Sequence, residues 1–579
     1  MLINSELLLQ YQRCKRRPYL DIHGDRKQRS QPTDLLIKLQ QDKIIHQQSI
    51  LAGRNYLRPE YQYGDWQTGA SATLELMQQG VECIYRGVLL ANYADIDWHY
   101  YARVNDDDEY KNSLKIVTTN PVENYYTVIN PEIGILLNTG QSSSFIASSG
   151  YYPGQTSWDE AIPIPTTEPD REYQMVSCPD LLIKQPGESR FGDWMYVPAT
   201  IELGKRPKQE YQVVAAYHAQ LLGMVQELEP EVAYLILRGK EANYPVDLER
   251  WTVQMQRILL ECVQSMESET APDIFISRQK CSLCQWYSDC YAIAHEQQHL
   301  SLLPGVTPVR YNQLQALNIT TPELLANVNP ADLENLPGFD SQIATKIVIQ
   351  AQSIAQNRPL LLPSARRVET DDIGYNPLFT NLSTLRPSQI ASKNIRNYSD
   401  IELYFDIEAQ PDLDLNYLLG VLVVNKRTNT ERFYSFLAEK LEDEESIWRQ
   451  FVDLVSQYPD APIYHFCIYE FDTVKRLAKL YHTPYSSVIP ILSRFVDVYE
   501  ELITNVALPI ESYALKAIAR WLGFEWRDSE ASGAKCIYWY DQWLQTSDRA
   551  LLEIIQRYNE DDCRATRSVK DWLAQFLAE

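Results

Sequence analysis

Residues 401–408 read Ile-Glu-Leu-Tyr-Phe-Asp-Ile-Glu, and this stretch decides the fold of the C-terminal part of the chain. Its apolar and aromatic residues predict a β-strand over 401–407 that runs into the sequence Asp406-x-Glu408. Side chains two residues apart on a strand share one face, so both carboxylates are expected to point the same way. Their spacing suits one or two hard cations. The stretch therefore predicts a strand that carries a metal site.

The pattern that follows predicts an α/β layered domain at residues 400–579. Further strands are predicted at 417–424, 431–437 and 462–467, and helices at 442–458, 470–481, 511–523 and 548–575. Three strands, a helix, a fourth strand and then more helices are typical of a sheet with helices packed against it.

Two later segments add candidate ligands to this domain. Glu470 stands where a predicted strand runs into a helix, and Asp472 is the alternative acid there. Tyr558 and Asp562 lie four positions apart on a predicted helix and so share one face. Four acids and a tyrosine from a strand, a loop and a helix fit a two-metal phosphodiesterase. The alternative is that these residues only cap a strand or face solvent.

These motifs resemble the DnaQ-like exonucleases of the ribonuclease H fold, in the tyrosine type of the DEDD class, and among them the YprB-like ribonuclease H domains. The resemblance covers the whole C-terminal domain and implies a 3′→5′ exonuclease that uses Mg²⁺ or Mn²⁺. It assigns the metal ligands and the tyrosine to Asp406, Glu408, Glu470, Tyr558 and Asp562. The family usually has Asp where this chain has Glu470.

Cysteines form a second constellation, in the N-terminal part of the chain. Cys281-x2-Cys284-x5-Cys290 is compact, whereas Cys14 lies far away in the sequence. Clustered cysteines in a cytosolic protein favour a metal site over disulfides. Zinc sites most often combine two pairs of ligands, whereas three local ligands and one distant ligand suit an iron–sulfur cluster. Zinc and ordinary packing cysteines remain the alternatives.

Carboxylates between these cysteines predict another catalytic site. Asp180 follows Ser-Cys-Pro, and Glu202 and Lys205 lie at the end of a second strand-like segment. Two acids on neighbouring strands of a hairpin can converge on one Mg²⁺, and a nearby lysine can orient a water or stabilise a phosphorane. A preceding helix carries His46. The alternative is that both acids merely face solvent.

This arrangement resembles the RecB-like nucleases of the PD-(D/E)XK superfamily. The resemblance covers residues 1–300 and is greatest to the subgroup, among the CRISPR-associated and AddB-type nucleases, that holds a 4Fe–4S cluster. It implies that the cluster ligands are Cys14, Cys281, Cys284 and Cys290. It further implies that the metal ligands are Asp180 and Glu202, and that the other catalytic residues are Lys205 and His46.

The chain departs from this family pattern at the lysine. The family has acid-x-Lys, but Gly204 stands at the lysine position and Lys205 comes one residue later. When the strand is aligned without a gap, Thr200 takes the place of the acid and Glu202 takes the place of the lysine. In that alternative the site binds nucleic acid but cuts it poorly.

The remaining segments predict an insertion, a connector and a linker. Residues 102–165 are expected to be a surface insertion in the N-terminal domain, because they are long and irregular. Residues 301–362 contain two Leu-Pro-Gly turns between helices and resemble the helix-hairpin-helix, whose backbone N–H groups contact phosphates. The alternative is a pair of packing hairpins. Residues 363–399 lack periodicity and are expected to be a linker.

The charge and hydropathy of the sequence argue against two classes of protein, the polybasic binders and the membrane-spanning proteins. The 579 residues include 53 Lys and Arg against 77 Asp and Glu, which gives a net charge of −24. This balance argues against a polybasic coat for nucleic acid or for an anionic membrane, but not against an enzyme whose acids bind metal ions. No apolar run approaches the ~20 residues of a membrane span, and the start does not read as a signal peptide, so a cytoplasmic protein is expected.

The whole sequence predicts an α/β fusion of a PD-(D/E)XK nuclease-like domain, a helix-hairpin-helix-like connector and a ribonuclease H-like domain. Its expected partner is nucleic acid, with DNA favoured over RNA, and a helicase or repair protein is a further candidate. Two alternatives come from another class: a catalytically silent scaffold that binds nucleic acid, and a zinc-stabilised adaptor for a helicase. Metal content and a cleavage assay separate these alternatives.

Overall fold

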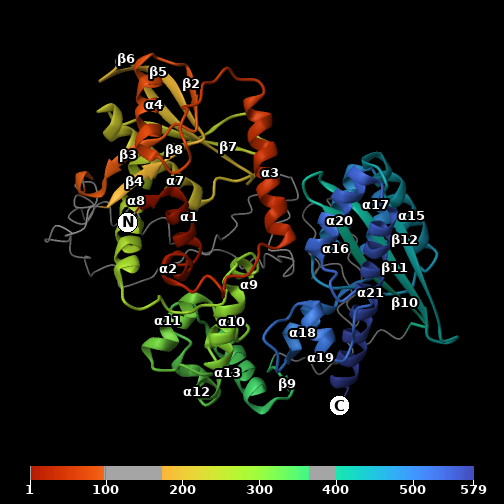
Figure 1. Ribbon diagram of the computed structural model, residues 1–579. Coiled ribbons are helices and arrows are strands. Elements are labelled where there is room, and N and C mark those ends of the chain that lie inside the picture. Colours follow the sequence, from red (N-terminus) through yellow and green to blue (C-terminus); the bar gives the residue numbers. More distant parts are fainter. Residues whose placement is uncertain (1, 97, 99–172, 364–398, 579) are drawn as a thin grey trace. The chain divides into compact units, whose positions relative to one another are not determined.

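The computed structural model describes residues 2–96, 98, 173–363 and 399–578 (Figure 1). The predicted insertion at 102–165 and nearly all of the predicted linker lie outside the described residues. The chain divides into two compact units, which are described separately below. The described residues of the first unit are those up to 98, 173–274 and 283–290, and those of the second unit are 275–282, 291–363 and 399–578.

Two sheets and several helices build the first unit (Figure 1). Its helices are α1 (Ser5–Arg13), α2 (Arg16–His23), α3 (Asp34–Leu51), α4 (Trp66–Gln78), α7 (Gln209–Gln226) and α8 (Leu248–Glu267). The larger sheet has the order β2-β5-β6-β7-β8, with strands β2 (Cys83–Tyr85), β5 (Leu181–Ser189), β6 (Gly192–Glu202), β7 (Val232–Leu237) and β8 (Tyr244–Asp247). The smaller sheet has the order β1-β4-β3, with strands β1 (Leu2–Asn4), β4 (Gln174–Ser177) and β3 (Leu89–Asn92).

A hairpin and a crossover organise the larger sheet. Strands β5 and β6 are antiparallel, and Gly192, with a φ of 124°, begins β6 directly after the turn. Strand β7 pairs with β6 in parallel. A parallel pair needs a long crossover connection, and helix α7 provides it. Asp180 directly precedes β5 and Glu202 ends β6, so the hairpin brings both acids to the same end of the sheet.

Two similar turns organise the helical segment of the second unit. The helices are α9 (Arg278–Cys281), α11 (Pro308–Ala316), α12 (Pro322–Ala326) and α13 (Ser341–Gln356), while α10 (Tyr287–Glu296) begins in the first unit and continues into the second. Gly305 and Gly338 have φ angles of 90° and 83°, a left-handed conformation that glycine adopts at little cost. Arg310 joins both turns, because its Nη1 donates to the carbonyl of Gly305 at 2.6 Å and its Nε donates to that of Gly338 at 2.7 Å.

A five-stranded mixed sheet forms the core of the C-terminal part of the second unit (Figure 1). Its order is β12-β11-β10-β13-β14, with β10 (Ile401–Gln410), β11 (Leu415–Asn425), β12 (Thr430–Leu437), β13 (Ile463–His465) and β14 (Phe495–Asp497). Strands β10, β11 and β12 are antiparallel, and β13 and β14 continue the sheet in parallel with β10. A short pair of strands, β9 (Leu360–Leu361) and β15 (Val506–Ala507), is antiparallel.

Helices cover this sheet. They are α15 (Glu444–Ser456), α16 (Tyr469–Leu480), α17 (Tyr485–Leu492), α18 (Val498–Asn505), α19 (Leu515–Trp521), α20 (Gly533–Thr546) and α21 (Arg549–Phe576). The strands and helices predicted in this region are confirmed, with three shortened. The helix predicted at 442–458 is observed at Glu444–Ser456. The strand predicted at 462–467 ends at His465, and Cys467 has a φ of 85° in the following loop. The helix predicted at 511–523 begins only at Leu515. The prediction missed β14, β15, α17, α18 and α20.

Helix α21 packs against β10, β11 and β13, as Figure 1 shows. Near its C-terminal end, Lys570 Nζ donates to Glu402 Oε1 of β10 at 2.8 Å, and Lys426 Nζ reaches the same oxygen at 2.8 Å. Glu402 and Lys570 are both buried. Because an unpaired buried charge is costly, this pairing fixes the end of α21 to one position on β10.

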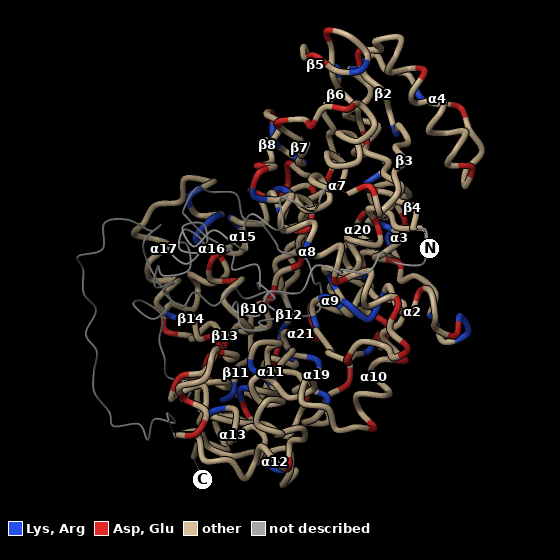
Figure 2. The backbone as a smooth tube through the Cα atoms, turned by 90° about the vertical axis from the view of Figure 1, so that its left-hand side faces the viewer, with Lys and Arg blue, Asp and Glu red and all other residues tan. Residues whose placement is uncertain are grey.

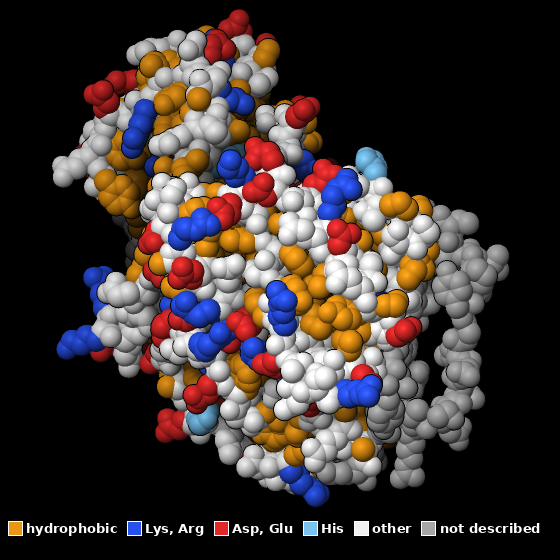
Figure 3. Space-filling view, turned by 90° about the vertical axis from the view of Figure 1, so that its right-hand side faces the viewer, with side chains coloured by type: hydrophobic (Ala, Val, Ile, Leu, Met, Phe, Trp, Pro, Cys, Tyr) orange, Lys and Arg blue, Asp and Glu red, His pale blue; other side chains and the backbone are white. Residues whose placement is uncertain are grey.

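Charged side chains of both signs are interspersed along the described chain (Figure 2). On the face drawn in Figure 3, Lys and Arg alternate with Asp and Glu among apolar side chains, rather than forming one continuous basic patch. This distribution agrees with the net charge of −24. Among the described helices, none is both long enough and apolar enough to pass through a bilayer.

Candidate functional site

Three carboxylates converge where β10 meets α21. Asp406 and Glu408 come from β10, Asp562 comes from α21, and one ligand oxygen of each lies within 4.8 Å of the others. In the described part of the chain, no other group of three or more His, Cys, Asp or Glu residues brings its ligand atoms within this distance of one another. Glu408 and Asp562 are buried and Asp406 is half-buried. Because like charges so close repel one another, the group is suited to a divalent cation.

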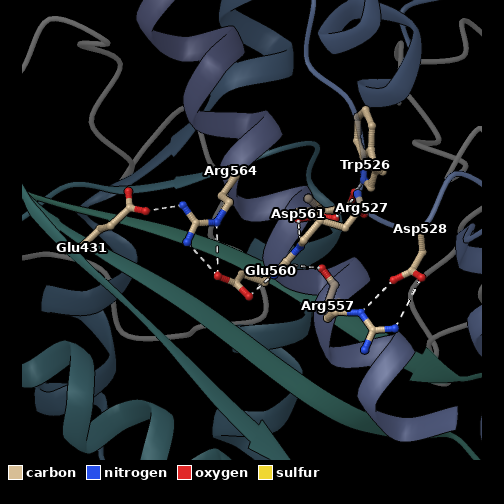
Figure 4. Close-up of polar contacts among 9 residues, drawn as sticks. Glu431, Trp526, Arg527, Asp528, Arg557, Glu560, Asp561 and Arg564 are labelled. Carbon is tan, nitrogen blue, oxygen red and sulfur yellow. Dashed lines mark hydrogen bonds and ion pairs between the residues drawn. The ribbon is translucent and has the colours of Figure 1, made fainter. Parts of the chain in front are cut away.

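Trp526 positions the carboxylate of Asp562. Its indole Nε1 donates to Asp562 Oδ1 at 2.7 Å. The next residue, Arg527, is bound to α21 through Asp561, with its backbone N 2.9 Å from Oδ2 and its Nε 2.8 Å from Oδ1 (Figure 4). Asp528 accepts from Arg557 Nε of the same helix at 2.9 Å. Residues 526–528 are therefore held against α21 beside the candidate metal ligand.

A chain of ion pairs continues from this contact toward β12 (Figure 4). Glu560 accepts from Arg527 Nη2 at 2.9 Å and from Arg564 Nη2 at 2.7 Å. Arg564 also binds Glu431 of β12, which Arg567 approaches at 2.7 Å. The hydrogen bond from Arg564 lowers the pKa of Glu431. These ion pairs join α21, in the helical turns next to Asp562, to Arg527 and to strand β12.

Asn559 positions Asp406, and Gly420 makes room for it. Asn559 Nδ2 donates to Asp406 Oδ2 at 2.6 Å. Gly420 lies opposite Asp406 in the pairing of β10 with β11. A Cβ atom on Gly420 would lie 1.7 Å from Asn559 Oδ1, so any side chain there would displace the amide. A glycine inside a strand often marks such a close approach, and this was the sequence signal for the contact.

Replacing Trp526 with Phe is expected to weaken divalent-metal binding about tenfold, because Asp562 loses the indole N–H that orients it. Calorimetric titration with Mn²⁺ measures the affinity. Trp521→Phe is the matched control, since this second indole of the same unit packs edge-on against Trp572. Equal affinities for Trp526→Phe and the unmodified protein would contradict a positioning role.

Glu470 and Tyr558, which were also predicted for this site, lie in different surroundings. Glu470 is buried at the start of α16, with Oε2 3.5 Å from His465 Nδ1. Burial raises the pKa of Glu470, and the neighbouring His465 opposes this rise. Burial also raises the pKa of Tyr469, and the charges of both Glu470 and Glu408 raise it further, so Tyr469 lies within electrostatic reach of both acids.

The alternative acid and the tyrosine differ in exposure. Asp472 is exposed on α16, where Lys475 Nζ lies 3.4 Å from its Oδ1. Tyr558 is only 2% exposed, and Lys516 Nζ lies 4.8 Å from the centre of its ring. The group of three acids that the described residues form includes neither Glu470 nor Tyr558. The catalytic roles of these two residues stay predictions.

The first unit brings Asp180 and Glu202 together at the end of its hairpin. Asp180 Oδ1 accepts from Gln47 Nε2 at 2.7 Å, and its Oδ2 accepts from the backbone N of Ile201 at 2.7 Å. Glu202 Oε2 lies 3.5 Å from Lys43 Nζ of α3. Burial raises the pKa of Glu202 to about 7, and the charge of Asp180 contributes to this rise. Both acids are buried, which excludes the interpretation that they merely face solvent.

The other residues predicted for this site lie on two different elements. His46 is half-buried on α3, and burial, followed by the charge of Arg238, lowers its pKa. Lys205 is half-buried in the segment after β6. Sequence reasoning missed Lys43 and Gln47, which no spacing rule connects with the hairpin.

The four candidate cluster cysteines share one degree of exposure. Cys14, Cys281, Cys284 and Cys290 are all half-buried, whereas the other cysteines are buried, with the exception of Cys178. Burial raises the pKa of Cys290 to about 11, and the charge of Cys14 contributes to the rise. Cys14 likewise contributes, after burial, to the raised pKa of Cys284. Cys14 therefore lies within electrostatic reach of both cysteines, although it is distant from them in the sequence.

One comparison with known proteins identifies part of the chain. Residues 403–574 match the family model described as the RNase_H superfamily, and this match contains all three converging acids. Residues 403–574 are therefore an RNase H superfamily domain, in agreement with the ribonuclease H fold predicted for this region. The chain matches no curated protein and no solved structure. These comparisons assign the N-terminal region to no family.

Proposed function

We propose that the RNase H superfamily domain is a metal-dependent nuclease that hydrolyses phosphodiester bonds from the 3′ end of a nucleic acid. The observation that carries this proposal is the convergence of Asp406, Glu408 and Asp562 within 4.8 Å. An all-carboxylate donor set matches the oxygen preference of Mg²⁺ and Mn²⁺. The membership of the domain supports a nucleic-acid substrate.

Each residue of this site has a proposed task. Asp406, Glu408 and Asp562 would hold the metal ions. Asn559 fixes the orientation of the Asp406 carboxylate, and Trp526 fixes that of Asp562. A bound divalent ion lowers the pKa of water and offsets charge at the phosphate. Glu470 supports the second metal position, and Tyr558 orients the attacking water. Because the acids repel one another without a cation, a bound metal ion would relieve this repulsion.

A cleavage assay on the full chain tests this proposal. Protein purified without oxygen is incubated with single- and double-stranded DNA and RNA, labelled at either end, with Mg²⁺, Mn²⁺ or EDTA. We expect products that shorten from the 3′ end only when metal is present, with DNA cut faster than RNA. Cleavage that persists in EDTA would overturn the metal-dependent mechanism. No cleavage of any of these substrates would overturn the proposal and favour the silent scaffold.

A second candidate function concerns the first unit. We also propose that this unit is a RecB-like nuclease of the PD-(D/E)XK superfamily, whose metal ligands are Asp180 and Glu202. The antiparallel β5–β6 hairpin, the α7 crossover and the parallel strand β7 support this proposal, because they bring both buried acids to one end. His46 and Lys205 remain the catalytic residues that the resemblance implies. The alternative is a clamp that binds nucleic acid without cutting it.

The cysteines and the connector complete the proposal. Four cysteines are proposed to hold a 4Fe–4S cluster, namely Cys14, Cys281, Cys284 and Cys290. Thiolates are the donors that such a cluster requires, and Cys14 lies within electrostatic reach of Cys284 and Cys290. Burial raises the pKa of Cys290 and the charge of Arg16 opposes this rise. A metal that binds a thiol removes its proton, so the thiolate would form when the cluster binds. The left-handed turns at Gly305 and Gly338 are proposed to contact phosphates.

A further inference from the structure

Helix α3 presents two neighbouring side chains to the acids of the first unit. Lys43 and Gln47 are four residues apart and so share one face of the helix. Gln47 Nε2 donates to Asp180 Oδ1 at 2.7 Å, and Lys43 Nζ lies 3.5 Å from Glu202 Oε2. One face of α3 therefore supplies a neutral donor to the first acid and a cation to the second.

The charge of Lys43 acts on three buried groups at once. It opposes the effect of burial on the pKa of both Asp180 and Glu202, and it adds to the effect of burial that lowers the pKa of His218 to about 3. His218 is buried on α7, where its Nδ1 is hydrogen-bonded to Ser177 Oγ. The ammonium group thus lies among residues from the hairpin and from the crossover helix.

Lys43 is also placed to meet a substrate. Its side chain is 40% exposed, whereas that of Glu202 is 9% exposed, so the ammonium group lies between the buried acids and solvent. Phosphodiester hydrolysis develops negative charge on the phosphate oxygens, and a fixed cation beside the metal ligands stabilises it. Gly204, at the lysine position of the motif, has no side chain to supply that charge.

We infer that Lys43, on α3, supplies the catalytic cation of the Asp180–Glu202 site in place of Lys205. The inference rests on the nuclease function proposed for the first unit. Lys43 then stabilises the charge that develops on the phosphate, while Gln47 and the backbone N–H of Ile201 hold Asp180 in place.

The test uses the full chain with its C-terminal site disabled by Asp406→Asn. In that background, Lys43→Met is expected to slow Mg²⁺-dependent cleavage about 100-fold, as the loss of one charge-stabilising group does. Mn²⁺ binding, measured by calorimetry, is not expected to weaken, because removing the positive charge beside Glu202 does not disfavour a cation at the two acids. Lys43→Arg is expected to retain part of the activity. Lys184→Met is the control, since this lysine of β5 pairs with Glu82.

Each remaining outcome decides against the inference in a recognisable way. If Lys205→Met abolishes cleavage and Lys43→Met does not, the cation is Lys205. If Lys43→Met weakens Mn²⁺ binding and cleavage equally, Lys43 only positions Glu202. If the Asp406→Asn background shows no cleavage that Asp180→Asn removes, the proposed nuclease function of the unit fails, and the role of Lys43 fails with it. Thermal unfolding of Lys43→Arg and Lys43→Met shows whether either variant has lost its fold.

Discussion

Replacing Asp562 with Asn is expected to abolish the Mg²⁺-dependent cleavage by the RNase H superfamily domain, with a loss of about 100-fold or more. The substitution keeps the size of the side chain and an oxygen that can still accept from Trp526. It removes one of three negative charges whose ligand oxygens lie within 4.8 Å. The effect on activity should therefore come from the lost metal ligand and not from a lost fold.

Thermal unfolding without metal separates these two causes. The three acids repel one another in the absence of a cation, so Asp562→Asn is expected to leave the unfolding temperature unchanged or to raise it. Asp571→Asn is the matched control, because this exposed acid of the same helix forms ion pairs with Arg567 and Lys570 and belongs to no group of acids that the described residues form. A double variant, Asp406→Asn with Asp562→Asn, that cleaved at the full rate would show that these acids bind no catalytic metal.

Replacing Cys284 with Ala is expected to remove the iron from the protein. Without oxygen, the unmodified protein should be brown and should contain about four irons per chain, as a 4Fe–4S cluster requires. Loss of one thiolate should bleach the colour and destabilise the first unit, because a cluster that joins distant segments contributes to folding. Metal analysis, the visible spectrum and thermal unfolding measure the three effects.

Cys178→Ala is the matched control for the cluster. Cys178 is also half-buried and lies in the same unit, but the cysteine spacing does not include it. The control should keep its iron and its colour. Zinc without iron in the unmodified protein would contradict the cluster and favour the zinc-stabilised adaptor.

The strands and long helices of the RNase H superfamily domain were predictable, because their hydrophobic period is regular. Strands β10 and β11 and helix α21 are long and strongly patterned, and their observed bounds differ by a few residues from the predicted ones. Strand β14 has only three residues and gives no period of its own. Helix α20 contains the run Ile-Tyr-Trp-Tyr, whose β-branched and aromatic residues favour strands locally, so that tertiary packing decides its conformation.

The residues of the candidate sites were predictable only where the metal ligands stand together in one short sequence motif. Asp406 and Glu408 are two residues apart, and a strand places them on one face. Asn559 and Trp526 reach the acids from other segments, and sequence spacing does not show such contacts. The same holds for Lys43, which meets Glu202 only because α3 packs against β6. Motifs identify ligands, while the residues that orient them come from the tertiary fold.

Helix α21 contacts β10 at two points, and together these contacts fix the position of the helix along the strand that carries two of the candidate metal ligands. Asn559 meets Asp406 toward the middle of α21, and Lys570 meets Glu402 near its C-terminal end. The two points are about 13 Å apart along the strand and about 16 Å apart along the helix, from the rise per residue of each. One inserted residue between Asp562 and Lys570 would turn one point by about 100° relative to the other. Length changes in this interval should therefore be far less tolerated than substitutions on its exposed face.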